Sequence, residues 1–179
     1  MSLLEPVLML RKALQKNAPA LVLLLAALAL SACGFRLRGD ATLPFATVFV
    51  SGGQGTPLYP ELARRLRGEA GARLMETAEQ AEAVIEFGML NFDKQVLTIS
   101  GGGRVREFLL SLKIIFRVHD GKGGEWLKTG EISIKRDFSF SDSQALAKEA
   151  EERALVQTMY ADALDQMMRR LASARRPGA

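Results

Sequence analysis

The single cysteine of the chain carries its clearest chemical signal. Cys33 is the only cysteine among 179 residues, and it follows Leu30, Ser31 and Ala32 at the end of an apolar run. A hydrophobic residue and two small residues before a cysteine form a lipobox, because small side chains let extended backbone enter a protease groove. Cleavage there would make Cys33 the new N-terminus, and its thiol would carry a diacylglycerol. A lone cysteine fits lipid attachment better than a disulfide or metal framework.

The residues before Cys33 have the pattern of a secretion signal. An apolar run over residues 18–30, interrupted by one proline, is preceded by three cations, Arg11, Lys12 and Lys16. The alternative is a transmembrane helix, which needs about 20 apolar residues. Because this run is shorter and ends in a small-residue cleavage pattern, we expect residues 1–32 to be a signal peptide that is removed.

The mature chain is expected to be one lipid-anchored domain. Removal of residues 1–32 takes away three basic residues and one acidic residue, which leaves 21 basic and 19 acidic residues and a net charge of +2. Each buried methylene contributes about 0.8 kcal/mol, and two acyl chains hold a protein on a membrane. We therefore expect a permanent anchor, an N-acyl group and an S-diacylglycerol on Cys33, and no other cofactor. Residues 33–44 would be a tether, residues 45–173 a folded domain and residues 174–179 a tail.

A second chemical signal is a group of cations near a glycine-rich turn and a helix start. Arg104 and Arg106 follow three consecutive glycines, and Lys148 lies early in the predicted C-terminal helix. These cations would form an anion site if the turn and the helix start lie together. The alternative is an ordinary solvated surface. The anions would be lipid phosphates rather than nucleic acid, because a lipoprotein beyond the inner membrane rarely meets nucleic acid.

Catalysis is not expected. His119 is the only histidine and lies beside a predicted turn, and acylation of Cys33 would leave no free thiol. No histidine and cysteine cluster for a metal can be assembled. The run Gly101-Gly102-Gly103 lies between two predicted strands rather than before a helix, so a hairpin turn is a better interpretation than a phosphate-binding loop.

Two kinds of periodicity define the elements that must position these residues. A first strand is predicted over 47–50, a helix begins near Thr56 and Pro57 and ends near Gly71, and irregular strand-forming sequence covers 83–99. Alternating apolar residues then predict two long strands with one buried face. They are Phe108, Leu110, Leu112, Ile114, Phe116 and Val118, followed by Trp126, Ile132, Ile134, Phe138 and Phe140.

The last element is a long amphipathic helix. It is predicted to begin near Asp142 or Ser143 and to end near Leu171, with a 3-4 spacing of apolar residues and cations in its last turn. Such a helix is about 40 Å long, which matches the length of the strands. We therefore predict an α+β fold, a two-layer sandwich with two helices on one face of a four-stranded sheet, in the order β-α-β-β-β-α.

Several motifs resemble those of the LptE (RlpB) family of lipopolysaccharide-assembly lipoproteins. The mature start Cys-Gly-Phe-Arg-Leu-Arg-Gly over 33–39 is similar to the start of that family. Further similarities are Arg-Val-Arg-Glu-Phe over 104–108, Lys-Arg-Asp-Phe over 135–138 and Ala-Leu-Ala-Lys-Glu over 145–149. Met-Tyr over 159–160 and Arg-Arg-Leu over 169–171 continue the resemblance. It covers essentially the whole mature chain.

The resemblance implies an outer-membrane lipoprotein that faces the periplasm and is not an enzyme. It would plug the lumen of the β-barrel LptD, support its assembly and assist the delivery of lipopolysaccharide to the outer leaflet. Gly34, rather than an aspartate that retains lipoproteins at the inner membrane, agrees with this placement. In the family, lipopolysaccharide contact is ascribed to basic residues near the hairpin tip and at the start of the last helix. Lys148 matches the second position, and Arg104 and Arg106 are the nearest cations to the first.

Two other classes of function stay open at this point. A stand-alone lipid- or glycan-binding outer-membrane lipoprotein that serves another transport system would need an apolar cavity of its own. A hydrolase would need two carboxylates that converge in a cleft, and no spacing in the sequence indicates such a pair.

Overall fold

Two long antiparallel strands form one side of the sheet and carry much of its buried face. The computed structural model describes residues 42–68 and 70–178, and within them β4 (Val105–His119) pairs with β5 (Glu125–Ser139). The predicted alternation is confirmed, because nine residues with even numbers are buried on one face, whereas Phe108 and Phe140 are half-buried. The nine are Leu110, Leu112, Ile114, Phe116, Val118, Trp126, Ile132, Ile134 and Phe138.

The long strand β3 (Ala83–Ile99) lies on the other side of β4 and is antiparallel to it. The first residues of β3, from Ala83 to Glu86, also pair in parallel with β1 (Thr47–Ser51). Beyond Glu86, the outer edge of β3 has no neighbouring strand among the described residues. The register with β4 shifts three times along β3, and two of these irregularities lie between Val96 and Ile99.

The sheet has five strands, so the prediction of four is wrong. The missed strand is β2 (Arg73–Leu74), which pairs in parallel with β1 and gives the order β2-β1-β3-β4-β5. Two residues are too few to show a strand period in a sequence. The strand exists because backbone amides of Arg73 and Met75 donate to the carbonyls of Ala46 and Val48 at 2.9 and 2.8 Å.

The first helix, α2 (Leu58–Gly68), begins and ends inside its predicted range. Pro57 lies in the turn before the helix. After Gly68, the carbonyls of Arg65 and Leu66 accept hydrogen bonds from the amides of Ala70 and Ala72. Gly71 has a φ of +63°, a left-handed conformation that glycine adopts without steric cost and that turns the chain toward β2.

The C-terminal helix is α3 (Ala145–Ala172), and the short 3₁₀ turn η2 (Asp142–Gln144) lies directly before it. Another 3₁₀ turn, η1 (Ala78–Gln80), lies earlier in the chain, between β2 and β3. The predicted caps Asp142 and Ser143 both lie in η2, and the residue before α3 is Gln144, which makes no side-chain capping bond. Ser173 ends the helix, and its amide donates to the carbonyls of Arg169 and Arg170.

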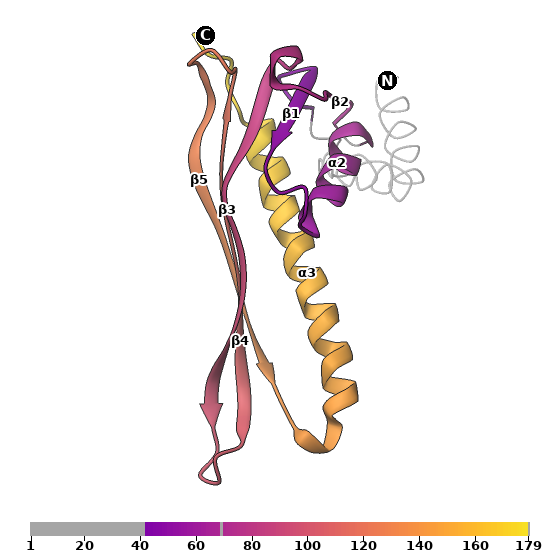
Figure 1. The fold of residues 1–179 in the computed structure, drawn as a ribbon, viewed down its shortest axis with the longest axis vertical. Coiled ribbons are helices and arrows are strands. Elements are labelled where there is room, and N and C mark those ends of the chain that lie inside the picture. The colour runs from indigo at the N-terminus through magenta and orange to yellow at the C-terminus, as the bar shows by residue number, and fades with distance from the viewer. Residues whose placement is uncertain (1–41, 69, 179) are drawn as a thin grey trace, which may run out of the picture. The chain divides into compact units, whose positions relative to one another are not determined.

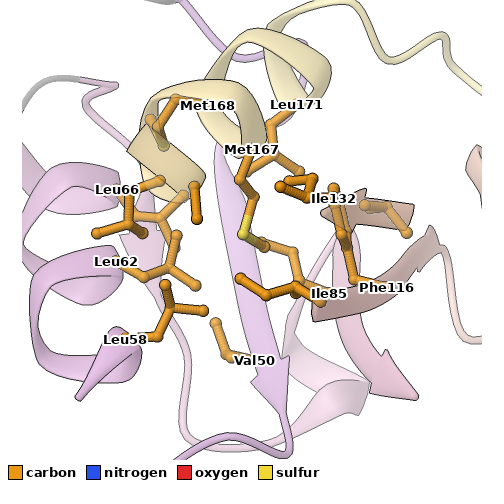
Figure 2. Packing of buried hydrophobic residues seen from close by; sticks show 14 of the residues in the cluster. Val50, Leu58, Leu62, Leu66, Ile85, Phe116, Ile132, Met167, Met168 and Leu171 are labelled. Carbon is orange, nitrogen blue, oxygen red and sulfur yellow. The ribbon is translucent and has the colours of Figure 1, made fainter. Parts of the chain in front are cut away.

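Both helices cover the same face of the sheet, as predicted. In Figure 2, Leu58, Leu62 and Leu66 of α2 point toward side chains of α3 and toward the sheet residues Val50 and Ile85. Six residues of α3 are buried in this core: Met159, Ala163, Leu164, Met167, Met168 and Leu171. Each Å² of buried apolar surface contributes about 25 cal/mol, so this region is the main source of stability.

The core occupies only part of the length of α3. Figure 1 shows α2 beside the C-terminal half of α3, whereas the N-terminal half runs along the sheet toward the β3–β4 turn without a second helix. Here we call the end that holds this turn and the start of α3 the distal end. No helix among residues 42–68 and 70–178 is both long and apolar enough to cross a membrane. The expected signal peptide, Cys33 and most of the tether lie outside the described residues.

Candidate functional site

The distal end begins with a tight turn between β3 and β4. The amide of Gly103 donates to the carbonyl of Ser100 at 2.9 Å, and the amide of Ser100 donates to the carbonyl of Arg104 at 2.8 Å. Gly103 has a φ of +76°, which favours glycine at this position. The three glycines therefore form a hairpin tip between two strands, as predicted.

Arg104 and Arg106 place two exposed guanidinium groups at this tip. Arg106 has the same parity along β4 as the buried Leu110, so it lies on the face of the sheet that α3 covers farther along. Its carbonyl accepts a hydrogen bond from the amide of Phe140 at 2.7 Å. Phe140 follows β5 and leads into α3, so this bond brings Arg106 next to the segment that starts the helix (Figure 1).

Lys148 lies at the same end but in a different environment. Its Nζ donates to Oγ of Ser139 at 3.1 Å and to Oε2 of Glu151 at 2.8 Å, and it lies 5.5 Å from the centroid of the Phe138 ring. The side chain is only 16% exposed. Lys148 therefore attaches the first turns of α3 to the end of β5 and presents a small part of its ammonium group to solvent.

A further lysine, absent from the predicted site, joins the sheet to the helix. Nζ of Lys94 lies 2.6 Å from Oε2 of Glu152 and 4.3 Å from the centroid of the Phe108 ring. The sequence contains a signal for it, because Lys94 interrupts the apolar residues Leu90, Phe92 and Val96 on one face of β3. A charged residue in that row needs a partner from the element that covers it.

Three phenylalanines form an aromatic group beside Lys94 and Lys148. The rings of Phe108 and Phe138 are stacked with centroids 6.4 Å apart, and Phe140 meets Phe108 edge to face at 5.6 Å. Lys94 of β3 and Lys148 of α3 both lie over this aromatic group: Nζ of Lys94 is 4.3 Å from the Phe108 centroid and 6.0 Å from the Phe138 centroid, and Nζ of Lys148 is 5.5 Å from the Phe138 centroid. The distal half of the molecule is therefore held by aromatic and cation–π contacts rather than by a wide aliphatic core.

The other cations of the last strand do not join this group. Nη2 of Arg136 donates to Oδ2 of Asp162 at 2.7 Å, toward the middle of α3, and Lys135 has the parity of the opposite face. The structure therefore brings Lys148 and the backbone of Arg106 to one end and leaves Arg136 as an ion pair between β5 and α3.

The one histidine makes local contacts. Nε2 of His119 lies 3.2 Å from Oε2 of Glu86, and Nδ1 accepts a hydrogen bond from the amide of Gly121. Ion pairing with Arg117, the main cause, holds the pKa of Glu86 below its usual range. No group of three or more potential metal ligands occurs in the described part of the chain. The arrangement is that of a surface ion pair.

A hollow of about 500 Å³ lies at the opposite end of the strands, next to Trp126. One of its carboxylates, Asp120, accepts hydrogen bonds from the amides of Lys122 and Gly124, and these bonds lower its pKa. Its other carboxylates belong to Glu79 and Glu82. A hydrogen bond from its own backbone amide is the main cause that lowers the pKa of Glu79. Glu82 accepts a hydrogen bond from the amide of Ala46. The hydrogen bonds that lower the pKa values of Asp120 and Glu79 favour the ionised carboxylate, which is not suited to act as a general acid.

Comparisons with known proteins agree on one family. The model of a family described as LptE, lipopolysaccharide-assembly, matches residues 45–171. The solution structure of an uncharacterized lipoprotein B from Nitrosomonas europaea is 34% identical with a TM-score of 0.68, and the match covers 78% of this chain and 91% of that one. The crystal structure of rare lipoprotein B from Shewanella oneidensis is 25% identical with a TM-score of 0.60, covering 71% and 94%.

A minor lipoprotein from Acinetobacter baumannii shares the fold at 18% identity, with a TM-score of 0.60 and coverage of 76% of this chain and 98% of that one. The matched range includes the turn with Arg104 and Arg106, the start of α3 with Lys148, and the complete helical core. The chain belongs to the LptE family of lipopolysaccharide-assembly lipoproteins.

Proposed function

We propose that this chain is a lipid-anchored protein of the outer membrane that faces the periplasm and plugs the β-barrel LptD. It supports the assembly of that barrel and assists the transport of lipopolysaccharide to the outer leaflet and its insertion there. The observation that carries the proposal is the family match over residues 45–171, which spans nearly all of the described domain. The role is non-enzymatic and needs no cofactor.

The shape of the domain supports a role as a plug. β3 has 17 residues and α3 has 28, which correspond to about 55 Å at 3.3 Å per residue and about 42 Å at 1.5 Å per residue. Barrels of twenty-odd strands leave a lumen wide enough to hold other structure. A long sheet backed along one face by a helix of similar length is a suitable insert for such a lumen.

The anchor in this proposal is Cys33. A cysteine that carries a diacylglycerol and an N-acyl group has more than the two chains that stable membrane attachment requires. The lipobox residues before it are the support for this assignment. Exchange of Cys33 for serine should release the mature domain from the membrane fraction, and retention of the variant on the membrane would contradict the anchor.

The lipopolysaccharide contact is assigned to Arg104, Arg106 and Lys148. The two guanidinium groups are exposed, and each can hold a phosphate through two parallel hydrogen bonds. Lys148 has three protons on Nζ, of which two are used by Ser139 and Glu151. In this proposal the third binds the same anion as Arg106, whose backbone carbonyl is bonded to Phe140 in the segment that leads into α3.

The test is charge reversal with a matched control. Arg104→Glu combined with Arg106→Glu should weaken binding of lipopolysaccharide and leave co-purification with LptD unchanged. Lys135→Glu changes an equally exposed cation on the other face of β5 and should bind as the wild type does. Equal binding by all three proteins would reject the contact site. Extraction of the chain alone from membranes that contain LptD would reject the plug and favour a stand-alone lipoprotein.

Lys148 needs a separate variant, because its side chain is packed against Phe138. Lys148→Glu would place a second carboxylate beside Glu151 and would disturb the start of α3 as well as the anion contact. Lys148→Met keeps an unbranched apolar side chain beside the Phe138 ring, and it removes the charge together with the hydrogen bonds to Ser139 and Glu151 without adding a carboxylate. Weaker lipopolysaccharide binding by Lys148→Met, with an unchanged melting temperature, is the expected result, and unchanged binding would remove Lys148 from the site.

A further inference from the structure

One long edge of the sheet, on β3, has no neighbour in the described part of the chain. β3 pairs with β1 only from Ala83 to Glu86, and beyond that point it continues beside β4 alone (Figure 1). Its pairing with β4 is regular from Met89 to Val96, between one register shift and the next. Here we call the outer side of residues 89–96 the open edge.

The register shows which backbone groups form the open edge. The amide of Phe140 donates to the carbonyl of Arg106, so even-numbered residues along β4 direct their backbone groups toward β5. Odd-numbered residues of β4 therefore bond to the odd-numbered residues of β3 opposite them. The amides and carbonyls of the even-numbered residues point away from the sheet, and these residues are Leu90, Phe92, Lys94 and Val96. Their outward backbone groups have no hydrogen-bond partner among residues 42–68 and 70–178.

The other long edge of the sheet, on β5, is blocked. Nη2 of Arg170 donates to the carbonyl of Glu131 at 2.9 Å, and the amide of Arg175 donates to that of Trp126 at 3.1 Å. Gly130 leaves room for this arginine, because a Cβ there would lie 2.8 Å from Nη1 of Arg170. Natural sheets block the edges that must not pair. A sheet that blocks one long edge and leaves the other open keeps the open one available for a partner.

The side chains along the open edge indicate the chemistry of that partner. Leu90 and Phe92 lie on the face that holds the core, pack against it and are only half-buried. On the opposite face, Asn91 and Gln95 are exposed. An added strand would cover Leu90 and Phe92 with apolar side chains and direct alternate polar side chains to the other face. The partner that fits is an extended polypeptide segment in which apolar and polar residues alternate.

A second copy of this chain fits the open edge poorly. Antiparallel pairing of two open edges must join outward residues to outward residues. The two registers centred on this stretch place Asp93 opposite Asp93, or Lys94 opposite Leu90. The first register sets like charges against each other, and the second brings a charged group over a half-buried leucine.

We propose that the open edge of β3 binds an extended segment of LptD by strand addition. This pairing rests on the proposed function, in which the barrel surrounds the domain, and it specifies where and how the two chains join. The wall strands of a closed barrel are already paired on both sides. The segment is therefore one that connects two wall strands and folds into the lumen. Main-chain hydrogen bonds hold it, and Leu90 and Phe92 select its apolar side chains.

Amide hydrogen exchange resolved to single residues tests this pairing in the full lipidated chain, alone and in its purified complex with LptD. In the free chain the amides of Phe92 and Lys94 should exchange fast and that of Asp93 slowly, because only Asp93 faces β4. In the complex the two fast amides should exchange about a hundredfold more slowly. The amide of Ser133 points outward from β5 and is the internal control, which should stay fast.

A proline substitution tests the same contact by competition. Val96→Pro removes one outward amide at a position that is 48% exposed and leaves the bonds to β4 in place. Ser133→Pro does the same at an exposed position of β5 and is the matched control. When each variant is produced together with an equal amount of wild-type chain, Val96→Pro should occupy LptD about tenfold less often than the wild type. Ser133→Pro should occupy LptD as often as the wild type, and the two variants should have equal melting temperatures.

The outcomes separate this pairing from the proposed function. If LptD does not co-purify with the wild-type chain, the plug itself fails. If LptD co-purifies and the amides of Phe92 and Lys94 exchange as fast as in the free chain, strand addition alone is overturned. An equal slowing at Ser133 would show general shielding inside the lumen and would also overturn it. So would equal occupancy of LptD by the two proline variants, or slow exchange in a free chain that sediments as a dimer, because a second copy would then cover the open edge.

Discussion

Nζ of Lys94 lies 2.6 Å from Oε2 of Glu152, and this contact joins the middle of β3 to the N-terminal half of α3. The two side chains are 32 and 22% exposed, so the pair is partly shielded from solvent. Lys94 also lies over the ring of Phe108. The pair therefore lies beside the distal part of the core, because Lys94 is in register with the fully buried Leu110.

Removal of this contact should loosen the first half of α3. We expect Lys94→Ala to lower the free energy of unfolding by about 1 kcal/mol, because it removes a partly exposed ion pair and a cation–π contact. Amide hydrogen exchange should become faster between Ala145 and Val156 and stay unchanged in the buried second half of the helix. The control is Glu149→Gln, an exposed carboxylate of the same helix half. Equal protection of both helix halves in Lys94→Ala would contradict this role.

A buried leucine of the core and an exposed leucine at the start of α3 should respond differently to the same substitution. Leu62 is 0% exposed between α2 and α3, so Leu62→Ala should cost about 2–5 kcal/mol of unfolding free energy because it leaves a cavity. Leu146 is 82% exposed, so Leu146→Ala should change stability by less than about 0.5 kcal/mol. Urea unfolding of both variants measures the difference. A large loss in Leu146→Ala would show that Leu146 packs against the domain.

Acid should remove the contribution of one carboxylate on α2. The hydrogen bond from Arg64, with a further one from Arg65, lowers the pKa of Glu61 from 4.5 to about 2. Because the folded-state pKa is the lower one, the stabilisation is complete at neutral pH and is lost as the pH falls from about 4.5 toward 2. Glu61→Gln should therefore be less stable than the wild type at pH 7, and the difference should shrink below pH 4.5. The effect is small, since the Glu61 side chain is 38% exposed.

Urea midpoints of the wild type and Glu61→Gln, measured from pH 7 to pH 3, test this dependence. A difference that stays constant over that range would show that the carboxylate charge of Glu61 does not stabilise the fold.

The outer edge of β5 should associate with other chains when its cover is removed. Nη2 of Arg170 donates to the carbonyl of Glu131 at 2.9 Å, and the amide of Arg175 donates to that of Trp126 at 3.1 Å. These bonds occupy edge carbonyls that would otherwise accept another strand. Arg170→Ala should increase aggregation in light scattering, whereas Arg169→Ala, an exposed arginine of the same turn, should not. Equal scattering by the two variants would contradict a protective role.

Much of the sheet could be predicted because its last two long strands, β4 and β5, have one buried face. The alternation in β4 and β5 depends only on local geometry, so the buried residues followed from their spacing. The buried stripe of α3 was predicted less completely. The spacing predicted a stripe made of Val156, Tyr160, Ala163, Met167 and Leu171. Val156 and Tyr160 are only half-buried, whereas three residues outside that stripe are buried: Met159, Leu164 and Met168. The helix contacts both the sheet and α2, and a second contact surface widens a stripe in a way that spacing alone does not show.

The site could be predicted only in part. The predicted site required the turn with Arg104 and Arg106 to lie near the start of α3. The backbone bond between Arg106 and Phe140 joins β4 to the segment that leads into α3, and it does not by itself bring the guanidinium groups to Lys148. The shielding of Lys148 was not predictable, because it depends on where the Phe138 ring of another element lies. β2 was missed because hydrogen bonds to β1, and not its own two residues, make it a strand.

The most direct test of the account is depletion of this chain in the cells that produce it. We predict that LptD will no longer assemble and that newly made lipopolysaccharide will fail to reach the cell surface, where an impermeant label would detect it. Wild-type chain should restore both, and chain with Arg104→Glu and Arg106→Glu should restore barrel assembly with less labelled lipopolysaccharide. Normal barrel assembly and normal surface labelling after depletion would contradict the proposed function.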